Sequence, residues 1–169
     1  MNKLAPPDSY HLDAAEGWLQ LGDHLEANAE LEKIAPENRA HPDVLQLRWQ
    51  VYAKEKRWDA CLDIATALTK MVPDRRFGWI HRAFSLHMLG RSHEAIDCLL
   101  AVMGKFESNA TMPYYLARFY CQTGQLIEAR QWLGKAFELT GSPEEQKRLK
   151  LKALEESDLA PLWKATGEA

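Results

Sequence analysis

The sequence has few cysteines and no long hydrophobic run. Its three cysteines, Cys61, Cys98 and Cys121, are odd in number and not closely paired, which argues against the disulfide framework of a small secreted domain. No stretch approaches the roughly 20 apolar residues that span a bilayer. The first ten residues lack the charged and then apolar order of a secretory signal. These absences predict a cytoplasmic protein that does not contact a membrane.

An excess of positive charge is also absent. The formal net charge is -3 and the sequence pI is about 6.1, so no global positive field attracts phosphate backbones or anionic lipids. Nucleic acid is therefore not an expected partner. The composition is otherwise ordinary for a globular chain, with 46% hydrophobic and 27% charged residues.

Sequence motifs that carry catalysis are missing as well. There is no Gly-rich phosphate loop, no Gly-x-Ser-x-Gly turn and no His-Glu-x-x-His pair. The six histidines are scattered without the spacing of metal ligands. His81 and His87, for example, lie about 600° apart around a helix axis and do not share a face. We therefore expect no enzymatic activity, no cofactor and no metal site.

The sequence does contain an internal repeat, with a period of about 34 residues. A glycine, four residues and an alanine begin at Gly22, Gly90 and Gly124, where one period separates the last two glycines and two periods separate the first two. The missing member falls at Lys56, where lysine replaces the glycine. This spacing predicts four repeats.

Each repeat has the pattern of two amphipathic helices. In the first helix, a column of small residues allows close helix packing, and it holds Ala15, Ala83 and Ala117. In the second helix, an alanine is followed four residues later by a leucine, as in Ala27 and Leu31, Ala95 and Leu99, and Ala129 and Leu133. The glycine lies in the turn between the two helices, so each repeat is predicted to be a helical hairpin.

The second repeat departs from this pattern. Trp49 stands in the alanine column, and lysine stands where the turn glycine should be. A one-residue shift near 54–57 would place Leu47 and Val51 in the core and turn Trp49 outward. The sequence leaves both registers open.

The repeat pattern stops after Gly141. Ser142, Pro143 and Glu145 have the order of a helix start, with an N-cap serine, a proline at the first helical position and a glutamate three residues after the cap. We expect a helix here that caps the repeats, followed by residues 158–163 folding back as an apolar plug. The leucines predicted to face inward are Leu149, Leu151 and Leu154; the basic residues predicted to stay in water are Lys147, Arg148, Lys150 and Lys152.

Together these columns resemble the tetratricopeptide repeat family over about residues 8–141, most closely at Trp79, Ala83, Leu86, Gly90 and Ala95. The resemblance implies an all-α, right-handed superhelical solenoid of about four helical hairpins with a C-terminal capping helix. The expected segments are an N-terminal tail (1–7), four repeats (8–41, 42–75, 76–109 and 110–141) and a capping helix with a tail (142–169).

The resemblance also implies a concave groove, lined by the first helices, that binds a peptide or helix of a partner. In the third and fourth repeats, first-helix residues offer an aromatic floor and a cationic, polar rim, the usual composition of an interface hot spot. The predicted partner-binding residues are Ile80, His81, Phe84, His87, Tyr114, Tyr115, Arg118 and Gln122. Phe84 and Tyr114 have a second interpretation, in which they pack neighbouring helices together.

The leading hypothesis is a protein-interaction scaffold or adaptor. One alternative is a dedicated chaperone for a secreted substrate, and another is a self-associating subunit whose groove receives residues 159–163 of a second copy. A helical-repeat RNA-binding protein is less favoured, because such proteins need a cationic column that recurs between repeats. Here that column reads Glu16, Gln50, Phe84 and Arg118.

Overall fold

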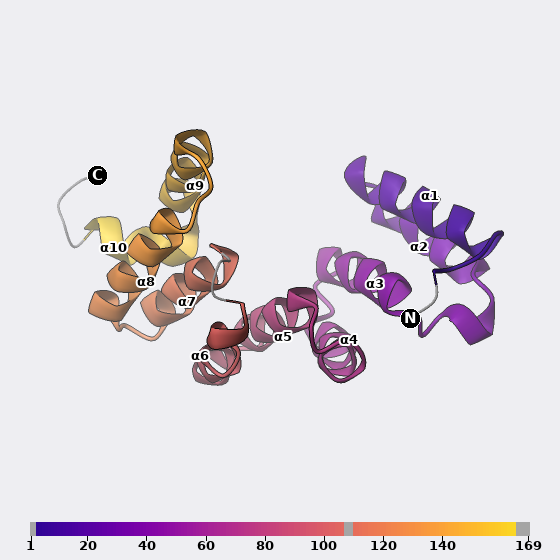
Figure 1. The fold of residues 1–169 in the computed structure, drawn as a ribbon, viewed down its shortest axis with the longest axis horizontal. Helices are drawn as coiled ribbons and strands as arrows, with labels where there is room; N and C mark the ends of the chain where they lie inside the picture. Colours follow the sequence, from indigo (N-terminus) through magenta and orange to yellow (C-terminus); the bar gives the residue numbers. More distant parts are fainter. Residues whose placement is uncertain (1–2, 107–109, 165–169) are drawn as a thin grey trace. The chain divides into compact units, whose positions relative to one another are not determined.

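The computed structural model describes residues 3–106 and 110–164, which contain helices and no strand (Figure 1). The predicted all-α fold class is confirmed. The α-helices are α1 (Asp8–Gln20), α2 (His24–Lys33), α3 (Pro42–Lys54), α4 (Trp58–Met71), α5 (Arg76–Met88), α6 (Ser92–Leu100), α7 (Thr111–Gln122), α8 (Leu126–Glu138), α9 (Pro143–Glu155) and α10 (Ala160–Lys164). Short 3-10 turns are η1 (Pro36–Asn38), η2 (Met103–Lys105) and η3 (Ser157–Leu159). The ends of the predicted tails, 1–2 and 165–169, and the end of the predicted third repeat, 107–109, lie outside the described residues.

The chain divides into two compact units, unit 1 (Met1–Arg82) and unit 2 (Ala83–Ala169), and the boundary falls within α5. In unit 1, α1 packs against α2 and α3 against α4; in unit 2, α7 packs against α8 (Figure 1). The alanines of both small columns are fully buried, as their spacing predicts: Ala15, Ala27, Ala83, Ala95, Ala117 and Ala129. Because they carry only a methyl group, the paired helices can approach closely.

The turns between paired helices share one backbone conformation. Gly22, Gly90 and Gly124 have φ values of 86°, 78° and 80°, and Lys56 has a φ of 58° at the equivalent position. L-residues adopt this left-handed region at a cost of about 1–2 kcal/mol, so Lys56 is held there by the packing of its hairpin.

The conformation of Lys56 decides the register of the second repeat. Since Lys56 takes the place of the turn glycine without a shift, Trp49 lies in the alanine column and is buried, at 6% exposed, together with Leu47 and Val51. Space for the indole comes from an aromatic cluster, in which the Trp49 ring meets His81 edge-on with centroids 4.1 Å apart. The register that turned Trp49 outward is wrong.

The capping helix α9 begins as predicted. The Ser142 hydroxyl accepts a hydrogen bond from the Glu145 backbone N–H at 3.2 Å, and the Glu145 carboxylate accepts one from the Gly141 N–H at 2.8 Å. The predicted inward position is confirmed for Leu149 and wrong for Leu151 and Leu154, which are 53% and 59% exposed. Leu149 shares its face with Ala153, since residues four apart share a helix face, whereas Leu151 is turned about 200° from Leu149. The predicted basic residues of α9 are exposed.

Residues 156–163, called the C-terminal segment below, fold back as predicted. Leu159 and Leu162 are 0% and 1% exposed and belong to the core of unit 2, which also contains Ala117, Leu133 and Ala153. Figure 1 shows α10 beside α8. At about 25 cal/mol per Å² of buried apolar surface, two buried leucines contribute several kcal/mol to this attachment.

Candidate functional site

The predicted partner-binding residues are divided between the two units. Ile80 and His81 lie in unit 1. Ile80 is buried, and the His81 ring stacks on Phe77 with a centroid separation of 3.7 Å. Burial lowers the pKa of His81 to about 4, so the ring is neutral near pH 7. Both side chains are therefore packing residues of unit 1 in this conformation.

The other six predicted residues form one cluster in unit 2, called the Arg118 site: Phe84, His87, Tyr114, Tyr115, Arg118 and Gln122. At its centre the guanidinium carbon of Arg118 lies 5.4 Å from the Phe84 ring centroid and 5.3 Å from the Tyr115 ring centroid. The two rings meet edge-to-face at 5.6 Å. Aromatic faces attract a cation and restrict its rotamers, so Arg118 is held in a fixed orientation.

The Arg118 site is occupied by the C-terminal segment of the same chain. The Nε and Nη2 atoms of Arg118 both donate to Asp158 Oδ2, at 3.0 and 2.6 Å, and Nη2 lies 3.2 Å from Glu156 Oε1. His87 Nε2 lies 3.3 Å from the same Asp158 oxygen, and Gln122 Nε2 donates to the Asp158 backbone oxygen at 3.4 Å. Three residues predicted to bind a partner thus converge on one internal aspartate.

The electrostatics of the Arg118 site favour an anion. Hydrogen bonds from His87 and Arg118 outweigh the effect of burial and lower the pKa of Asp158 to about 2. Because a carboxylate accepts and does not donate, the His87 Nε2–H is the donor, and the other ring nitrogen, Nδ1, is hydrogen-bonded to the Ser92 hydroxyl at 2.9 Å. The site is therefore arranged to hold a carboxylate on its cationic rim.

Tyr114 forms the apolar floor of the Arg118 site. It is buried, at 2% exposed, and the ammonium nitrogen of Lys152 lies 5.2 Å from its ring centroid. Among the described residues, its hydroxyl has no hydrogen-bond partner. Burial raises the pKa of Tyr114 to about 12, so the hydroxyl stays protonated and able to donate a hydrogen bond.

The equivalent positions in unit 1 form an open cavity. Four residues of unit 1 lie two periods of the repeat before residues of the Arg118 site. Glu16 is equivalent to Phe84, Gln46 to Tyr114, Leu47 to Tyr115 and Gln50 to Arg118. These four line a cavity of about 290 Å³ between α1 and α3, together with Leu12 and Asp43. We call these six residues the unit 1 groove. The same columns of the repeat therefore form a groove in unit 1 and a filled site in unit 2.

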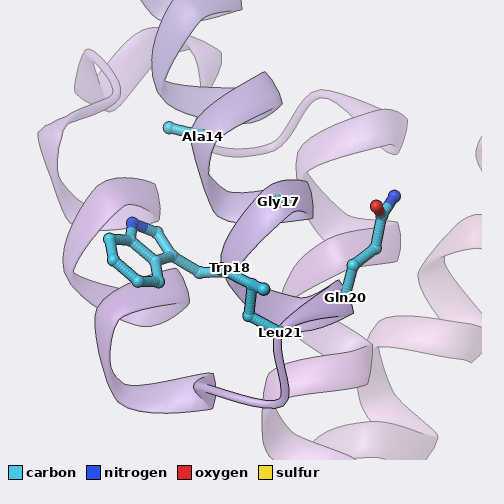
Figure 2. A pocket seen from close by; sticks show the side chains of 5 residues that line it. All are labelled: Ala14, Gly17, Trp18, Gln20 and Leu21. Atoms are coloured by element: carbon cyan, nitrogen blue, oxygen red, sulfur yellow. The ribbon is translucent and has the colours of Figure 1, made fainter.

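A second pocket lies at the C-terminal end of α1 and is lined by Ala14, Gly17, Trp18, Gln20 and Leu21 (Figure 2). Figure 2 shows the Trp18 and Gln20 side chains projecting to opposite sides of the helix. Trp18 is 37% and Leu21 77% exposed, so the lining is largely apolar surface in contact with water. None of these five lining residues carries an ionisable side chain.

Within the described ranges, no helix is both long and apolar enough to cross a membrane. The same residues contain no group of three or more His, Cys, Asp or Glu side chains placed to hold a metal ion.

Sequence reasoning missed Glu156 and Asp158 as members of the site. Neither residue falls in a repeat column, so the period of the repeat carries no information about them. The available signal was chemical: an acidic pair followed by leucines, downstream of a groove with a single arginine. The sequence did predict that residues 158–163 fold back, but not onto which surface.

Known proteins provide a comparison for the fold. No family model and no curated protein matches the sequence. Among solved structures, the chain is similar to TTC0263, a thermophilic TPR protein of Thermus thermophilus, at 19% identity and a TM-score of 0.78, over 95% of this chain and 84% of that one. It is also similar to MamA of Desulfovibrio magneticus RS-1, at 16% identity and a TM-score of 0.70, over 98% and 94% of the two chains. The described residues therefore have the tetratricopeptide-type fold that the sequence repeat predicts.

Proposed function

We propose that this protein is a non-catalytic scaffold that binds a peptide segment of a partner protein at the Arg118 site. The supporting observation is that the chain's own C-terminal segment is held there as a peptide ligand would be. Its carboxylates meet Arg118, and its leucines enter the core. A rigid arginine between aromatic rings, beside an apolar pocket, is the usual composition of a binding hot spot.

The internal segment also indicates the chemistry of the partner. Its residues Glu156, Asp158, Leu159 and Leu162 are the ones that make the ionic and apolar contacts. A partner segment of the pattern Glu-x-Asp-Leu-x-x-Leu would reproduce these contacts. Such a partner must displace the internal segment, whose tethering to the same chain gives it a high local concentration, typically on the order of millimolar.

Two further properties belong to the proposal. The three cysteines are free and buried, which fits a protein of a reducing compartment such as the cytoplasm. The C-terminal segment of a second copy has the same chemistry as the internal one, so exchange between two chains is a route to self-association.

A peptide-binding experiment on the full chain tests the proposal. The probe is a fluorescent peptide with the sequence of residues 154–163, and binding is followed by fluorescence anisotropy. The wild-type chain should bind weakly, because its own segment competes. Asp158→Arg places a second cation beside Arg118, and the repulsion should loosen the internal segment. Probe binding should therefore strengthen by about tenfold or more.

Two further variants complete this experiment. Asp97→Arg makes the same charge change at an exposed position of α6 and should leave probe affinity at the wild-type value. Adding Arg118→Glu to Asp158→Arg should abolish probe binding. The proposal fails if the Asp158→Arg chain keeps its helical circular dichroism and still binds the probe no better than wild type.

A further inference from the structure

The unit 1 groove is formed by the same repeat positions as the Arg118 site, yet no segment among residues 3–82 fills it. The cavity of about 290 Å³ lies between two adjacent first helices, α1 and α3. The Arg118 site demonstrates that these positions, in the same fold, can hold a short segment of polypeptide, here the turn η3 followed by α10. The period of the repeat therefore marks the unit 1 groove as a second binding surface.

The lining of the unit 1 groove combines an apolar floor with amides and a carboxylate. Leu12 and Leu47 belong to or pack against the core of unit 1 and form the apolar part. Gln46 and Gln50 are partly exposed, and Glu16 is exposed. These three side chains make no hydrogen bond or ion pair to another described residue, so their donors and acceptors face the cavity or water.

The second carboxylate of the lining, Asp43, already has a cationic partner. Its Oδ1 accepts a hydrogen bond from Arg75 Nη1. Glu16 is therefore the carboxylate in the unit 1 groove whose charge is not compensated by a neighbour. An anionic group beside an apolar floor gains most from a cation that brings its own apolar surface, as lysine and arginine do.

The charge of the unit 1 groove is opposite to that of the Arg118 site. Position for position, Glu16 replaces Phe84 and Gln50 replaces Arg118. The cation that holds the carboxylates of the C-terminal segment in unit 2 therefore has no counterpart at this position of the unit 1 groove. Gln50 takes its position, and the carboxylate of Glu16 lines the same cavity. A segment carrying Glu or Asp would be repelled from this groove.

We propose that the unit 1 groove binds a segment of a partner protein that carries a lysine or arginine next to a leucine-like residue. Glu16 pairs with the cation, Leu12 and Leu47 contact the apolar side chain, and the amides of Gln46 and Gln50 hydrogen-bond the peptide backbone. This site goes beyond the function proposed above, because it lies in the other unit and selects the opposite charge.

Two probes of equal length test this inference on the full chain. The acidic probe has the sequence of residues 154–163, and the basic probe replaces its three carboxylate residues, Glu155, Glu156 and Asp158, by lysine. Fluorescence anisotropy should detect binding of the basic probe to wild type. Glu16→Lys should weaken that binding by about tenfold or more.

Matched variants separate a specific site from general attraction to an acidic protein. Glu26→Lys changes the net charge equally but lies on an exposed face of α2, and it should alter basic-probe affinity by less than about twofold. The double substitution Glu16→Phe with Gln50→Arg copies the Phe84 and Arg118 pair into unit 1 and should switch the preference of this groove to the acidic probe.

The outcomes are distinct from those of the first proposal. Arg118→Glu should reduce acidic-probe binding and leave basic-probe affinity unchanged, since Arg118 lies in unit 2. The inference is overturned if wild type does not bind the basic probe. It is also overturned if Glu16→Lys and Glu26→Lys lower the affinity equally, because the attraction would then be non-specific.

Discussion

The two units use the same repeat columns in opposite ways. In unit 2, Arg118 draws in the acidic C-terminal segment, and two leucines of that segment complete the core. In unit 1, the equivalent position holds Gln50, Glu16 lies beside it, and the columns remain an open groove. The comparison teaches that the period of a repeat fixes where a binding surface lies, whereas single side chains decide its charge and its occupant.

The largest expected effect concerns the leucines that distinguish unit 2. Leu159→Ala removes a fully buried side chain and should lower the free energy of unfolding by about 2–5 kcal/mol. Leu151→Ala, at a residue that is 53% exposed, is the matched control and should change it by less than about 0.5 kcal/mol. Urea unfolding measures both. Equal losses would mean that the C-terminal segment is not part of the core of unit 2.

The next prediction concerns the coupling energy of one ion pair from each unit. The side chains of Arg118 and Asp158 are 11% and 21% exposed, whereas those of Arg48 and Glu32 in unit 1 are 13% and 48% exposed. Double-mutant cycles with alanine should give a coupling energy of about 2 kcal/mol for the first pair and below about 1 kcal/mol for the second. A larger coupling for the Arg48 pair would contradict the view that the Arg118 pair anchors the C-terminal segment.

As the pH falls, the stability of unit 1 should decrease at a higher pH than the stability that the Asp158 attachment contributes to unit 2. Burial lowers the pKa of His81 from 6.5 to about 4, so between these values the unfolded chain binds a proton that the folded chain does not. This contribution to the stability of unit 1 is therefore full above about pH 6.5 and is lost as the pH falls toward 4. The expected loss by about pH 4.5 is on the order of 2 kcal/mol.

The Asp158 attachment should respond only at lower pH. Its pKa is lowered from 3.8 to about 2, so its contribution is full above about pH 4 and is lost as the pH falls toward 2. Two-dimensional NMR during urea unfolding at several pH values can follow each unit separately. His81→Phe should remove the loss of unit 1 stability that is expected above pH 4. If this loss of stability is unchanged, it must come from another titratable group.

The smallest effect concerns the turns. Lys56→Gly should stabilise unit 1 by about 1 kcal/mol, because glycine adopts a positive φ without steric cost. Gly90→Lys should destabilise unit 2 by a similar amount, since an added Cβ there meets no atom within 4 Å and the cost is conformational. Thermal unfolding of both variants checks the equivalence of the two turns. A destabilising Lys56→Gly would show that the lysine makes a stabilising contact.

Periodic features were predictable from the sequence, and features that occur once were not. The alanines of the small columns and the turn glycines recur with the period of the repeat, and each is found buried or in the turn between paired helices as expected. The contact site of Asp158 could not be predicted from the repeat, because it depends on one arginine 40 residues earlier in the chain.

The misplaced leucines of α9 have a similar cause. The helix start at Ser142 was identified from local capping chemistry, which involves only neighbouring residues. Its inward face depends on which side of α9 meets α8, and the leucines of this basic helix do not settle that, because they point in different directions around its axis. Leu149 with Ala153 proved to be the packed pair, leaving Leu151 and Leu154 in water.

The buried cysteines allow the C-terminal segment to be followed chemically. Cys121 lies in the same core cluster as Leu159 and Leu162, and burial raises the pKa of its thiol. Cys61, in unit 1, has a pKa raised to about 11 by burial. Since only an exposed thiolate reacts quickly with alkylating reagents, labelling of Cys121 requires an opening of unit 2. The ratio of the two labelling rates therefore reports how often the segment leaves its site in the unmodified protein, with Cys61 as an internal reference.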